Sequence, residues 1–300
     1  MQSIKSWIFY HFVKYRLAKL AQKNYSLPEM RKMRDAESPR LFNLPQRLDA
    51  RAELIANCPG AWLTPPGNVG AGCILYLHGG AYVMGSVITH QGLAGHLAMA
   101  ANVPTFIFDY KLAPEHPYPA ALNDALAVFK SLQAANPDRP IAVAGDSAGG
   151  GLALALALAL RDQGFQAPAA LALMSPWTDL TLSSGSHVSK PSVDPFFPNQ
   201  TLLRTSANQY AGGQALDDHL ISPLFADLGK MPPSLIHVGG KEVLLDDSIE
   251  LVKKMQRQHS EARIRVFPAM WHVWQVFVGR FKEADESIVE LGAFLKSKLS

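Results

Sequence analysis

The chain has 300 residues, of which 48% are hydrophobic and 18% charged, and its formal net charge is +3. This length supports one large α/β domain with an insertion or two small domains, and the composition is too polar for a bundle of membrane helices. The two cysteines, Cys58 and Cys73, do not suggest a disulfide-dependent secreted scaffold. Cys73 lies inside an apolar run, where a buried thiol is expected.

The first 40 residues are the most basic part of the chain. They hold nine lysines and arginines against three acidic residues, a local charge of +6 that leaves −3 for the remainder. Apolar residues such as Phe9, Val13 and Leu17 recur at helical spacing over residues 3–22, which predicts an amphipathic helix packed over the main domain. Basic helices also bind lipid or nucleic acid, but no nucleic-acid motif accompanies this one, so reversible membrane contact is the remaining alternative.

Charged residues interrupt the N-terminal apolar stretch. His11, Lys14 and Arg16 follow residues 7–10 closely. A membrane-spanning helix needs about 20 mostly apolar residues, and a signal peptide needs a continuous apolar core with a cleavage site. We therefore expect a cytoplasmic protein without stable membrane insertion. Residues 24–45 are polar with scattered prolines, and we expect a connecting arm there.

From residue 70 onward, short apolar runs alternate with longer helical segments. This alternation predicts a mostly parallel central sheet covered by helices on both faces. The stretch at about 183–218 breaks the rhythm with serine, proline and asparagine, which indicates an insertion above the sheet. The expected strands are 73–77, 104–108, 140–144, 169–174, 234–238 and 263–268. The expected helices are 89–102, 119–135, 150–163, 246–258 and 284–298.

Residues 145–149 read Gly-Asp-Ser-Ala-Gly and match the G-x-S-x-G pattern of a nucleophile elbow. An apolar strand precedes the motif and a Leu/Ala-rich helix follows it, which is the setting that the elbow requires. The flanking glycines remove Cβ atoms that would clash in so sharp a turn. Ser147 is therefore the predicted nucleophile, and the alternative is a glycine-rich turn with an incidental serine.

Residues 78–81 read His-Gly-Gly-Ala and directly follow the expected strand 73–77. Acyl transfer needs preorganised N–H donors where a carbonyl oxygen becomes an anion. We predict an oxyanion hole formed by the N–H groups of Gly79 and Gly80, together with that of Ala148 after the nucleophile. His78 is expected to brace this loop by hydrogen bonding.

The predicted base is His272, which follows the expected strand 263–268 at the carboxyl edge of the sheet, where catalytic groups gather. Among the other histidines beyond the elbow, three candidates lie in an apolar strand or in or beside the insertion: His187, His219 and His237.

The predicted acid is Glu242, which lies in the loop after the expected strand 234–238. Asp246 is the second candidate. Asp246 and Asp247 have the positions of helix N-terminal residues that satisfy free N–H groups. The acid would fix the imidazole tautomer and stabilise the imidazolium.

Together these residues resemble the hormone-sensitive-lipase-like family of carboxylesterases. The resemblance extends over roughly residues 60–298 and rests on four segments: 78–81, 109–117, 145–149 and 272–275. In this family the acid opens an Asp-Pro-Leu-x-Asp segment, and residues 242–246 align with it, placing Glu242 at the acid position. Ala81 stands where the family has a third glycine.

The resemblance implies an α/β-hydrolase fold with a small helical cap. Residues 1–45 would form an N-terminal arm contributing to the cap. Residues 46–300 would form the catalytic domain, with the cap insertion at about 183–218.

We therefore predict a serine carboxylesterase that hydrolyses small or short-to-medium acyl-chain esters through an acyl-enzyme. We expect no metal and no cofactor, since neither metal-ligand spacing nor a complete nucleotide-binding fingerprint is present. A lactonase, amidase or acyltransferase using the same triad remains an alternative. A non-catalytic small-molecule receptor is a remote one, because His272 is present.

The expected partner is a small-molecule ester rather than a nucleic acid, and a homodimer stays open. Five residues near the loops are predicted to line an apolar substrate pocket, with plain core packing as the alternative for each: Tyr82, Val83, Phe196, Phe197 and Trp274.

Overall fold

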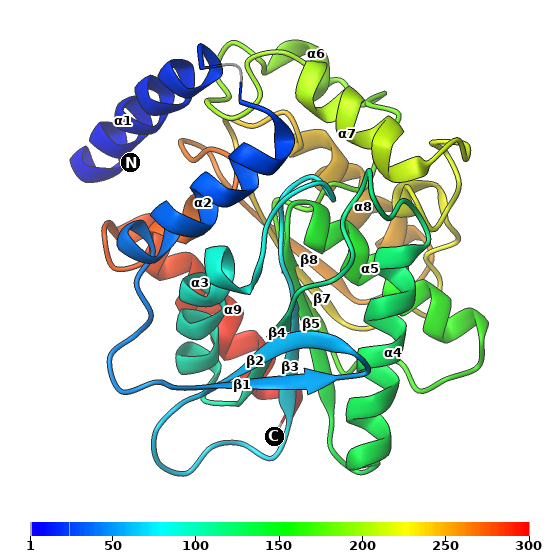
Figure 1. The fold of residues 1–300 in the computed structure, drawn as a ribbon. Coiled ribbons are helices and arrows are strands. Elements are labelled where there is room, and N and C mark those ends of the chain that lie inside the picture. Colours follow the sequence, from blue (N-terminus) through cyan, green and yellow to red (C-terminus); the bar gives the residue numbers. More distant parts are fainter. Residues whose placement is uncertain (1, 24, 300) are drawn as a thin grey trace.

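The computed structural model describes residues 2–23 and 25–299, and its centre is one eight-stranded sheet (Figure 1). The strand order is β1-β2-β4-β3-β5-β6-β7-β8, and the strands from β3 to β8 pair in parallel. The predicted α/β fold with a mostly parallel sheet is confirmed. All six expected strands form within two residues of their expected bounds: β3 (Cys73–Leu77), β4 (Thr105–Phe108), β5 (Ile141–Asp146), β6 (Leu171–Met174), β7 (Ser234–Gly239) and β8 (Ala262–Phe267).

A hairpin that the sequence analysis missed extends one edge of the sheet. It consists of β1 (Asp49–Ile55) and β2 (Cys58–Thr64), and β2 also runs antiparallel to β4. The turn residues Ala56 and Asn57 have φ of 51° and 62°, as a tight two-residue hairpin turn requires. Most of β1 is exposed, so it lacks the apolar alternation that marks a strand in sequence.

Helices cover both faces of the sheet because alternate residues of each strand point to opposite faces. Leu75 and Leu77 of β3 pack in one core with α4, α5 and α8, whereas Ile74 and Tyr76 pack in the other with α3 and α9. All five helices lie within two residues of their expected bounds: α3 (Val87–Ala101), α4 (Ala120–Ala135), α5 (Ala148–Asp162), α8 (Leu245–Arg257) and α9 (Lys282–Leu299).

Four further helices lie on the same side of the molecule, at the top of Figure 1. They come from the two segments expected to build the cap, and their assignment to a cap stays a prediction. Among the described residues, no helix combines the length and the apolar character needed to cross a bilayer. The four helices are α1 (Ile4–Ala21), α2 (Leu27–Leu41), α6 (Ser186–Ser189) and α7 (Thr201–Ala211).

The expectation of a connecting arm over residues 24–45 is wrong for most of its length, because α2 forms there; residue 24 lies outside the described residues. The physical reason is a capping box, in which the Ser26 N–H donates to the Glu29 carboxylate at 2.8 Å while the Ser26 side chain caps the first turn. Pro28 in the first turn adds a preset backbone angle.

Arg31 fixes α2 to the main domain. Its guanidinium donates to the carbonyl oxygens of Val83 at 2.7 Å and Ala113 at 2.8 Å, and pairs with both carboxylate oxygens of Glu115 at 2.8 Å. This planar fork uses the geometry that distinguishes arginine from lysine. Because Val83 follows the predicted oxyanion residues, the fork ties α2 to that loop.

Gly292 sets the close contact between α9 and α3. A Cβ atom at this position would lie 2.4 Å from Ala100 Cβ and 2.6 Å from the Ala100 carbonyl carbon. Helix propensity alone favours alanine over glycine by about 1 kcal/mol. Propensity therefore predicts that Gly292→Ala raises the free energy of unfolding, whereas the close packing predicts that it lowers it. We expect Gly292→Ala to lower the free energy of unfolding by about 1–3 kcal/mol, measured by urea denaturation. Unchanged or raised stability would contradict this account of the helix contact.

Candidate active site

Ser147 occupies the turn between β5 and α5. Its φ of 53° and ψ of −122° form a left-handed conformation that non-glycine residues rarely adopt. The Ser147 N–H donates to the Met174 carbonyl at 2.9 Å, and the Ser147 carbonyl accepts from the Trp177 N–H at 2.9 Å. Gly149 is required here, because a Cβ atom would lie 2.0 Å from the Leu77 carbonyl oxygen. The turn therefore holds the hydroxyl at the carboxyl edge of the sheet.

The structure brings the three predicted catalytic side chains into one hydrogen-bonded chain. His272 Nε2 lies 2.9 Å from Ser147 Oγ, and His272 Nδ1 lies 2.9 Å from Glu242 Oε2. The other carboxylate oxygen of Glu242 accepts from the Ser175 hydroxyl at 2.9 Å and from the Gly239 N–H. Both oxygens of this fully buried carboxylate therefore have partners, which fixes the side chain in one orientation.

The other carboxylates near Glu242 have structural positions. Asp246 and Asp247 lie in the first turn of α8, as expected. Asp247 is buried, and its carboxylate lies 3.1 Å from Nε2 of His187, so it joins α8 to the insertion. Glu242 is the carboxylate that the structure places against His272.

One predicted oxyanion donor needs correction. The Gly79 N–H donates to Asp146 Oδ1 at 3.1 Å, so this group already has a buried carboxylate as its acceptor. Within the described chain, the N–H groups of Gly80, Ala81 and Ala148 donate to no protein acceptor. The structure therefore excludes Gly79 as a donor to the oxyanion. The N–H of Ala81 is available for that role instead.

Asp146 is the residue that ties this loop to the elbow. Besides the Gly79 N–H, it accepts from the Tyr76 hydroxyl at 2.8 Å, and its second oxygen lies 3.5 Å from His90 Nε2. Burial raises the pKa of Asp146, but the charge of His90 and the hydrogen bonds from His90 and Tyr76 bring this pKa below its ordinary value. An ionised carboxylate therefore holds the loop and the strand together.

His78 has the expected bracing position. Its Nδ1 lies 2.9 Å from the Gly79 carbonyl oxygen, and its ring stacks on Tyr110 with centroids 4.2 Å apart. The Tyr110 hydroxyl donates to the His78 carbonyl at 2.7 Å. Burial, together with the charge of His90, lowers the pKa of His78 to about 3. The ring is therefore neutral and supports the loop.

Two of the five predicted pocket residues lie beside the predicted base. Phe196 and Phe197 lie against the His272 ring, with centroid distances of 5.8 Å and 4.9 Å and edge-on geometry. Both come from the insertion, so the insertion supplies an aromatic wall next to the predicted base.

The other three predicted pocket residues have packing contacts. Tyr82 stacks on Tyr210 of α7 with centroids 3.7 Å apart, and Val83 is buried beside it in the same core. Trp274 is fully buried and packs on Phe267 at 4.8 Å in an aromatic cluster beneath α1. Core packing, the alternative stated for each residue, describes Trp274 best.

Asp194 is a site residue that the sequence analysis missed. One carboxylate oxygen accepts from the N–H groups of Phe196 at 2.8 Å and Phe197 at 3.2 Å, and the other accepts from the Val243 N–H at 2.9 Å. Because Val243 directly follows Glu242, this carboxylate joins the aromatic wall to the loop of the predicted acid. An aspartate two residues before a phenylalanine pair, next to a proline, was the available signal for such a turn.

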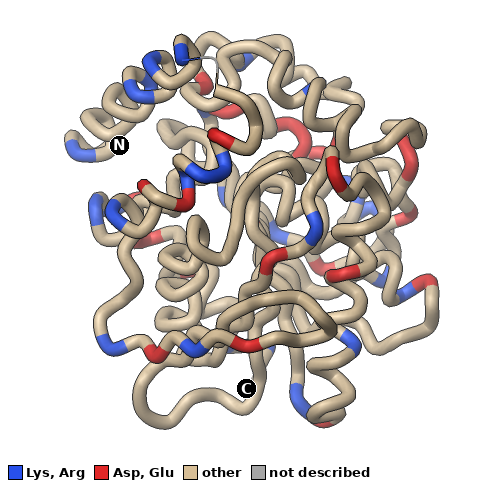
Figure 2. Tube along the Cα trace, viewed as in Figure 1, with Lys and Arg blue, Asp and Glu red and all other residues tan. Residues whose placement is uncertain are grey.

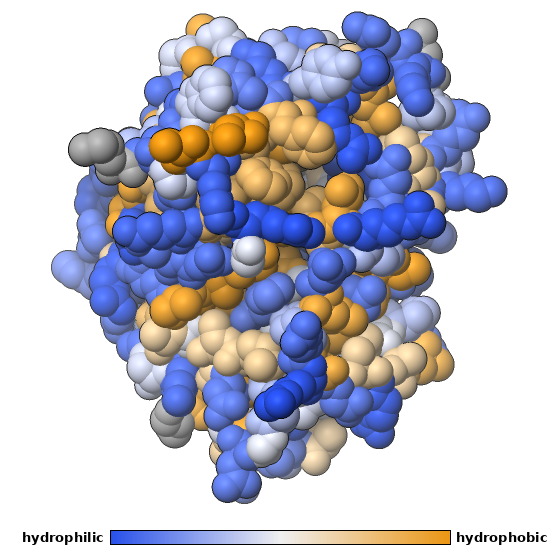
Figure 3. Space-filling model, turned by 90° about the vertical axis from the view of Figure 1, so that its left-hand side faces the viewer, coloured by the Kyte–Doolittle hydropathy of each residue, from blue (hydrophilic) through white to orange (hydrophobic). Residues whose placement is uncertain are grey.

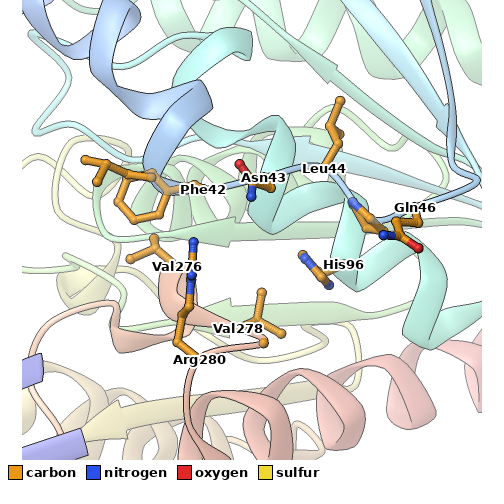
Figure 4. Close-up of a pocket in the computed structure, with 12 residues that line it drawn as sticks. Phe42, Asn43, Leu44, Gln46, His96, Val276, Val278 and Arg280 are labelled. Atoms are coloured by element: carbon orange, nitrogen blue, oxygen red, sulfur yellow. The ribbon is translucent and has the colours of Figure 1, made fainter. Parts of the chain in front are cut away.

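A separate recess of about 260 Å³ lies between the segment after α2, helix α3 and the loop after the short helix η2 (Trp274–Phe277). Figure 4 shows His96 and Arg280 at this recess together with Phe42. It contains none of the predicted site residues. In the part of the chain described here, no three His, Cys, Asp or Glu side chains are grouped to hold a metal ion.

Known proteins are similar to this chain in fold and in sequence. A family model for the alpha/beta hydrolase fold matches residues 74–276. An acetyl-hydrolase from Streptomyces hygroscopicus is 37% identical over 245 residues, which is 81% of each chain. An esterase from Acinetobacter venetianus is 37% identical over 226 residues, 75% of this chain and 74% of its own. The crystal structure of an esterase from the bacterial hormone-sensitive lipase family has a TM-score of 0.93 and 34% identity across the full length of both chains.

The parallel sheet, the elbow at its carboxyl edge and these matches define an α/β hydrolase. Within that fold, the chain belongs to the hormone-sensitive-lipase-like carboxylesterase family.

The contacts of Glu242 lead to a prediction about the acid. In Glu242→Gln, the amide NH₂ must face either His272 Nδ1–H or the Gly239 N–H. One of the two hydrogen bonds is then lost, because two donors face each other. We expect kcat on p-nitrophenyl acetate to fall by about 10²–10⁴-fold, with little change for the matched control Asp246→Asn. The reverse order of the two effects would assign the acid to Asp246.

The buried Asp194 leads to a prediction about pH. Burial raises its pKa from 3.8 to about 6, so the folded protein keeps a proton that the unfolded chain releases between these values. The stabilisation from this carboxyl is therefore present below pH 3.8 and lost as the pH rises through about 6. Relative to Asp194→Asn, the free energy of unfolding of the wild type should fall between pH 4 and pH 7 by on the order of 1–3 kcal/mol.

The control for this prediction is Asp138→Asn, which changes an exposed carboxyl to an amide. Urea denaturation at several pH values gives the comparison. A wild-type-minus-Asp194→Asn difference that is flat across this range, or that rises with pH, would contradict the assignment.

Proposed function

We propose that this protein is a serine carboxylesterase that hydrolyses small esters with short-to-medium acyl chains through an acyl-enzyme. The observation that carries the proposal is the continuous chain from Ser147 through His272 to Glu242, with 2.9 Å at both links. A hydroxyl, an imidazole and a buried carboxylate in this order activate a nucleophile for acyl transfer.

In the first half-reaction, Ser147 Oγ attacks the acyl carbon of the ester while its proton passes to His272 Nε2. Glu242 keeps its charge, holds the Nδ1 proton and stabilises the imidazolium. The C–O bond to the alcohol then breaks, and His272 returns the proton to the leaving oxygen. The product of this step is an ester between the acyl group and Ser147.

In the second half-reaction, water occupies the place of the alcohol. His272 takes a proton from the water as its oxygen attacks the acyl carbon, and then returns it to Ser147 Oγ as the acyl bond breaks. The carboxylic acid leaves, and the enzyme regains its starting protonation.

Three backbone N–H groups would stabilise the negative oxygen formed in both steps: those of Gly80, Ala81 and Ala148. None of the three donates to a protein acceptor among the residues that the structure describes, which supports this role. The loop that carries two of them is held by Asp146 before substrate binds, so little reorganisation is needed during the reaction.

Enclosure of the site supports a small substrate. Ser147 and His272 are only 6% and 4% exposed, and the Phe196–Phe197 wall lies directly against the imidazole. The names of related proteins point the same way. One is an acetyl-hydrolase, and another, EstE5, with a TM-score of 0.91 and 33% identity, was crystallised and soaked with p-nitrophenyl butyrate.

A substrate panel tests the acyl length and the leaving group. We expect kcat/KM to be highest for p-nitrophenyl acetate or butyrate and to fall from octanoate to palmitate, because long chains exceed the enclosed site. Aryl lactones and p-nitroanilides in the same panel separate an esterase from a lactonase or an amidase. A steady rise of kcat/KM toward palmitate would contradict the proposed substrate class.

Removal of the nucleophile tests the proposed chemistry. Ser147→Ala should lower kcat on p-nitrophenyl butyrate by about 10⁵–10⁶-fold, because no other hydroxyl is hydrogen-bonded to His272 Nε2 within the described residues. Circular dichroism and the thermal unfolding midpoint serve as controls for the fold. Turnover within an order of magnitude of the wild type would refute Ser147 as the nucleophile.

A further inference from the structure

One face of α1 exposes a row of large apolar side chains. Ile4, Trp7, Ile8, Phe12 and Tyr15 follow one another at spacings of one, three or four residues and are between 47% and 79% exposed. Thirteen large apolar residues are exposed in the described part of the chain, so this one helix carries an unusual share of them. Figure 3 looks onto the side of the molecule that carries α1 and α2 and shows apolar surface between rows of hydrophilic side chains.

The opposite face fixes α1 to the domain. Tyr10 and Val13 are buried, and the Tyr10 hydroxyl donates to the Val193 carbonyl at 2.9 Å. At the start of the helix, the Glu283 carboxylate accepts from the Ser3 N–H at 2.6 Å and from the Ser3 hydroxyl at 2.7 Å. Because these contacts fix α1, the helix cannot rotate about its axis to bury the exposed apolar row.

Positive charge borders the apolar row. The helix contains no acidic residue, and Figure 2 shows blue but no red along it. Arg16 pairs with Glu37 at 2.9 Å, and the Lys19 ammonium lies 5.3 Å from the Tyr15 ring centroid. At 100° per residue, Lys14 falls beside one edge of the exposed row, and Lys5 and Arg16 fall beside the other. Lys19 lies just inside that second edge, one turn or more beyond Tyr15.

We propose that α1 docks on an anionic lipid surface, with its axis in the plane of the interface. Isoleucine and phenylalanine side chains would enter the acyl boundary, whereas Trp7 and Tyr15 suit the headgroup level. The basic side chains at both edges would meet lipid phosphates while their stems lie along the apolar surface. This interaction goes beyond ester hydrolysis and does not depend on it.

Charge decides between a membrane and a second copy of the chain. A symmetric dimer through this face would place the basic edges of two helices near each other without an acidic residue from either α1. An anionic bilayer supplies the opposite charge to the same edges. The observed charge distribution therefore favours lipid.

Docking would also orient the catalytic centre. The Tyr10 ring packs on Trp271 with centroids 5.8 Å apart, and Trp271 directly precedes His272. The bound helix would thus place the side of the molecule that carries α1 and α2 at the lipid surface.

Vesicle flotation tests the proposal with two types of vesicle, pure phosphatidylcholine and phosphatidylcholine mixed with phosphatidylglycerol. We expect the wild type to float with the anionic vesicles at low salt and to dissociate as salt is raised. The double variant Trp7→Ser/Ile8→Ser and the double variant Lys5→Glu/Lys19→Glu should each lower the partition coefficient by about tenfold or more.

Two control variants remove exposed apolar surface or positive charge outside α1. Leu54→Ser removes an exposed apolar side chain on β1, and Lys230→Glu/Lys253→Glu makes the same charge change away from α1. Both controls should float like the wild type, and every variant should keep wild-type hydrolysis of soluble p-nitrophenyl acetate.

Absence of wild-type binding to anionic vesicles at low salt would overturn the proposal. Equal binding by the α1 variants and the controls would also overturn it. A wild-type dimer in sedimentation that Trp7→Ser/Ile8→Ser converts to a monomer, without vesicle binding, would assign the face to a second copy. Because binding is read without turnover, failure here is distinguishable from failure of the proposed esterase activity.

Discussion

A backbone that turns left-handed at Ser147, directly after a buried strand and directly before a helix, determines the geometry of the candidate active site. The turn exists because the Met174 carbonyl and the Trp177 N–H hold it and because Gly149 allows the Leu77 carbonyl to approach. It points one hydroxyl at the His272 ring and the first N–H groups of α5 toward the same region. A strained turn of this kind persists only where the surrounding structure is rigid, as the fully buried strands on both sides of β5 are.

Two buried aspartates join segments of the candidate site that are distant in sequence. Asp146 joins the elbow strand to the predicted oxyanion loop, and Asp194 joins the aromatic wall of the insertion to the loop that carries Glu242. In both cases the carboxylate accepts one backbone N–H group from another segment, which is how a buried charge is accommodated. The positions of donors, acid and wall therefore depend on carboxylates that take no part in the proposed proton transfers.

The sequence predicts well where one physical requirement acts on neighbouring residues. Five of the six parallel strands, β3 to β7, are mostly apolar because both of their faces are buried, whereas the edge strand β8 is partly exposed. The Ser147 motif needs its glycines within two residues. Prediction failed where the deciding partner is distant in sequence. The Gly79 N–H was assigned to an oxyanion because nothing local shows that Asp146, 67 residues away, accepts it. Asp194 was missed because its partner Val243 lies in another loop, whereas α2 was missed despite a local capping box at Ser26.

We propose that Ser147 is the group that becomes acylated, and covalent labelling identifies this group. Phenylmethylsulfonyl fluoride reacts with a serine whose proton a neighbouring imidazole accepts. After incubation, intact-mass spectrometry and peptide mapping give the number and position of adducts, with His272→Ala as the comparison. We expect one adduct, on the peptide containing Ser147, together with complete loss of esterase activity, and no adduct in His272→Ala. Complete inactivation with the label on another residue, or labelling of Ser147 that leaves the activity intact, would contradict it.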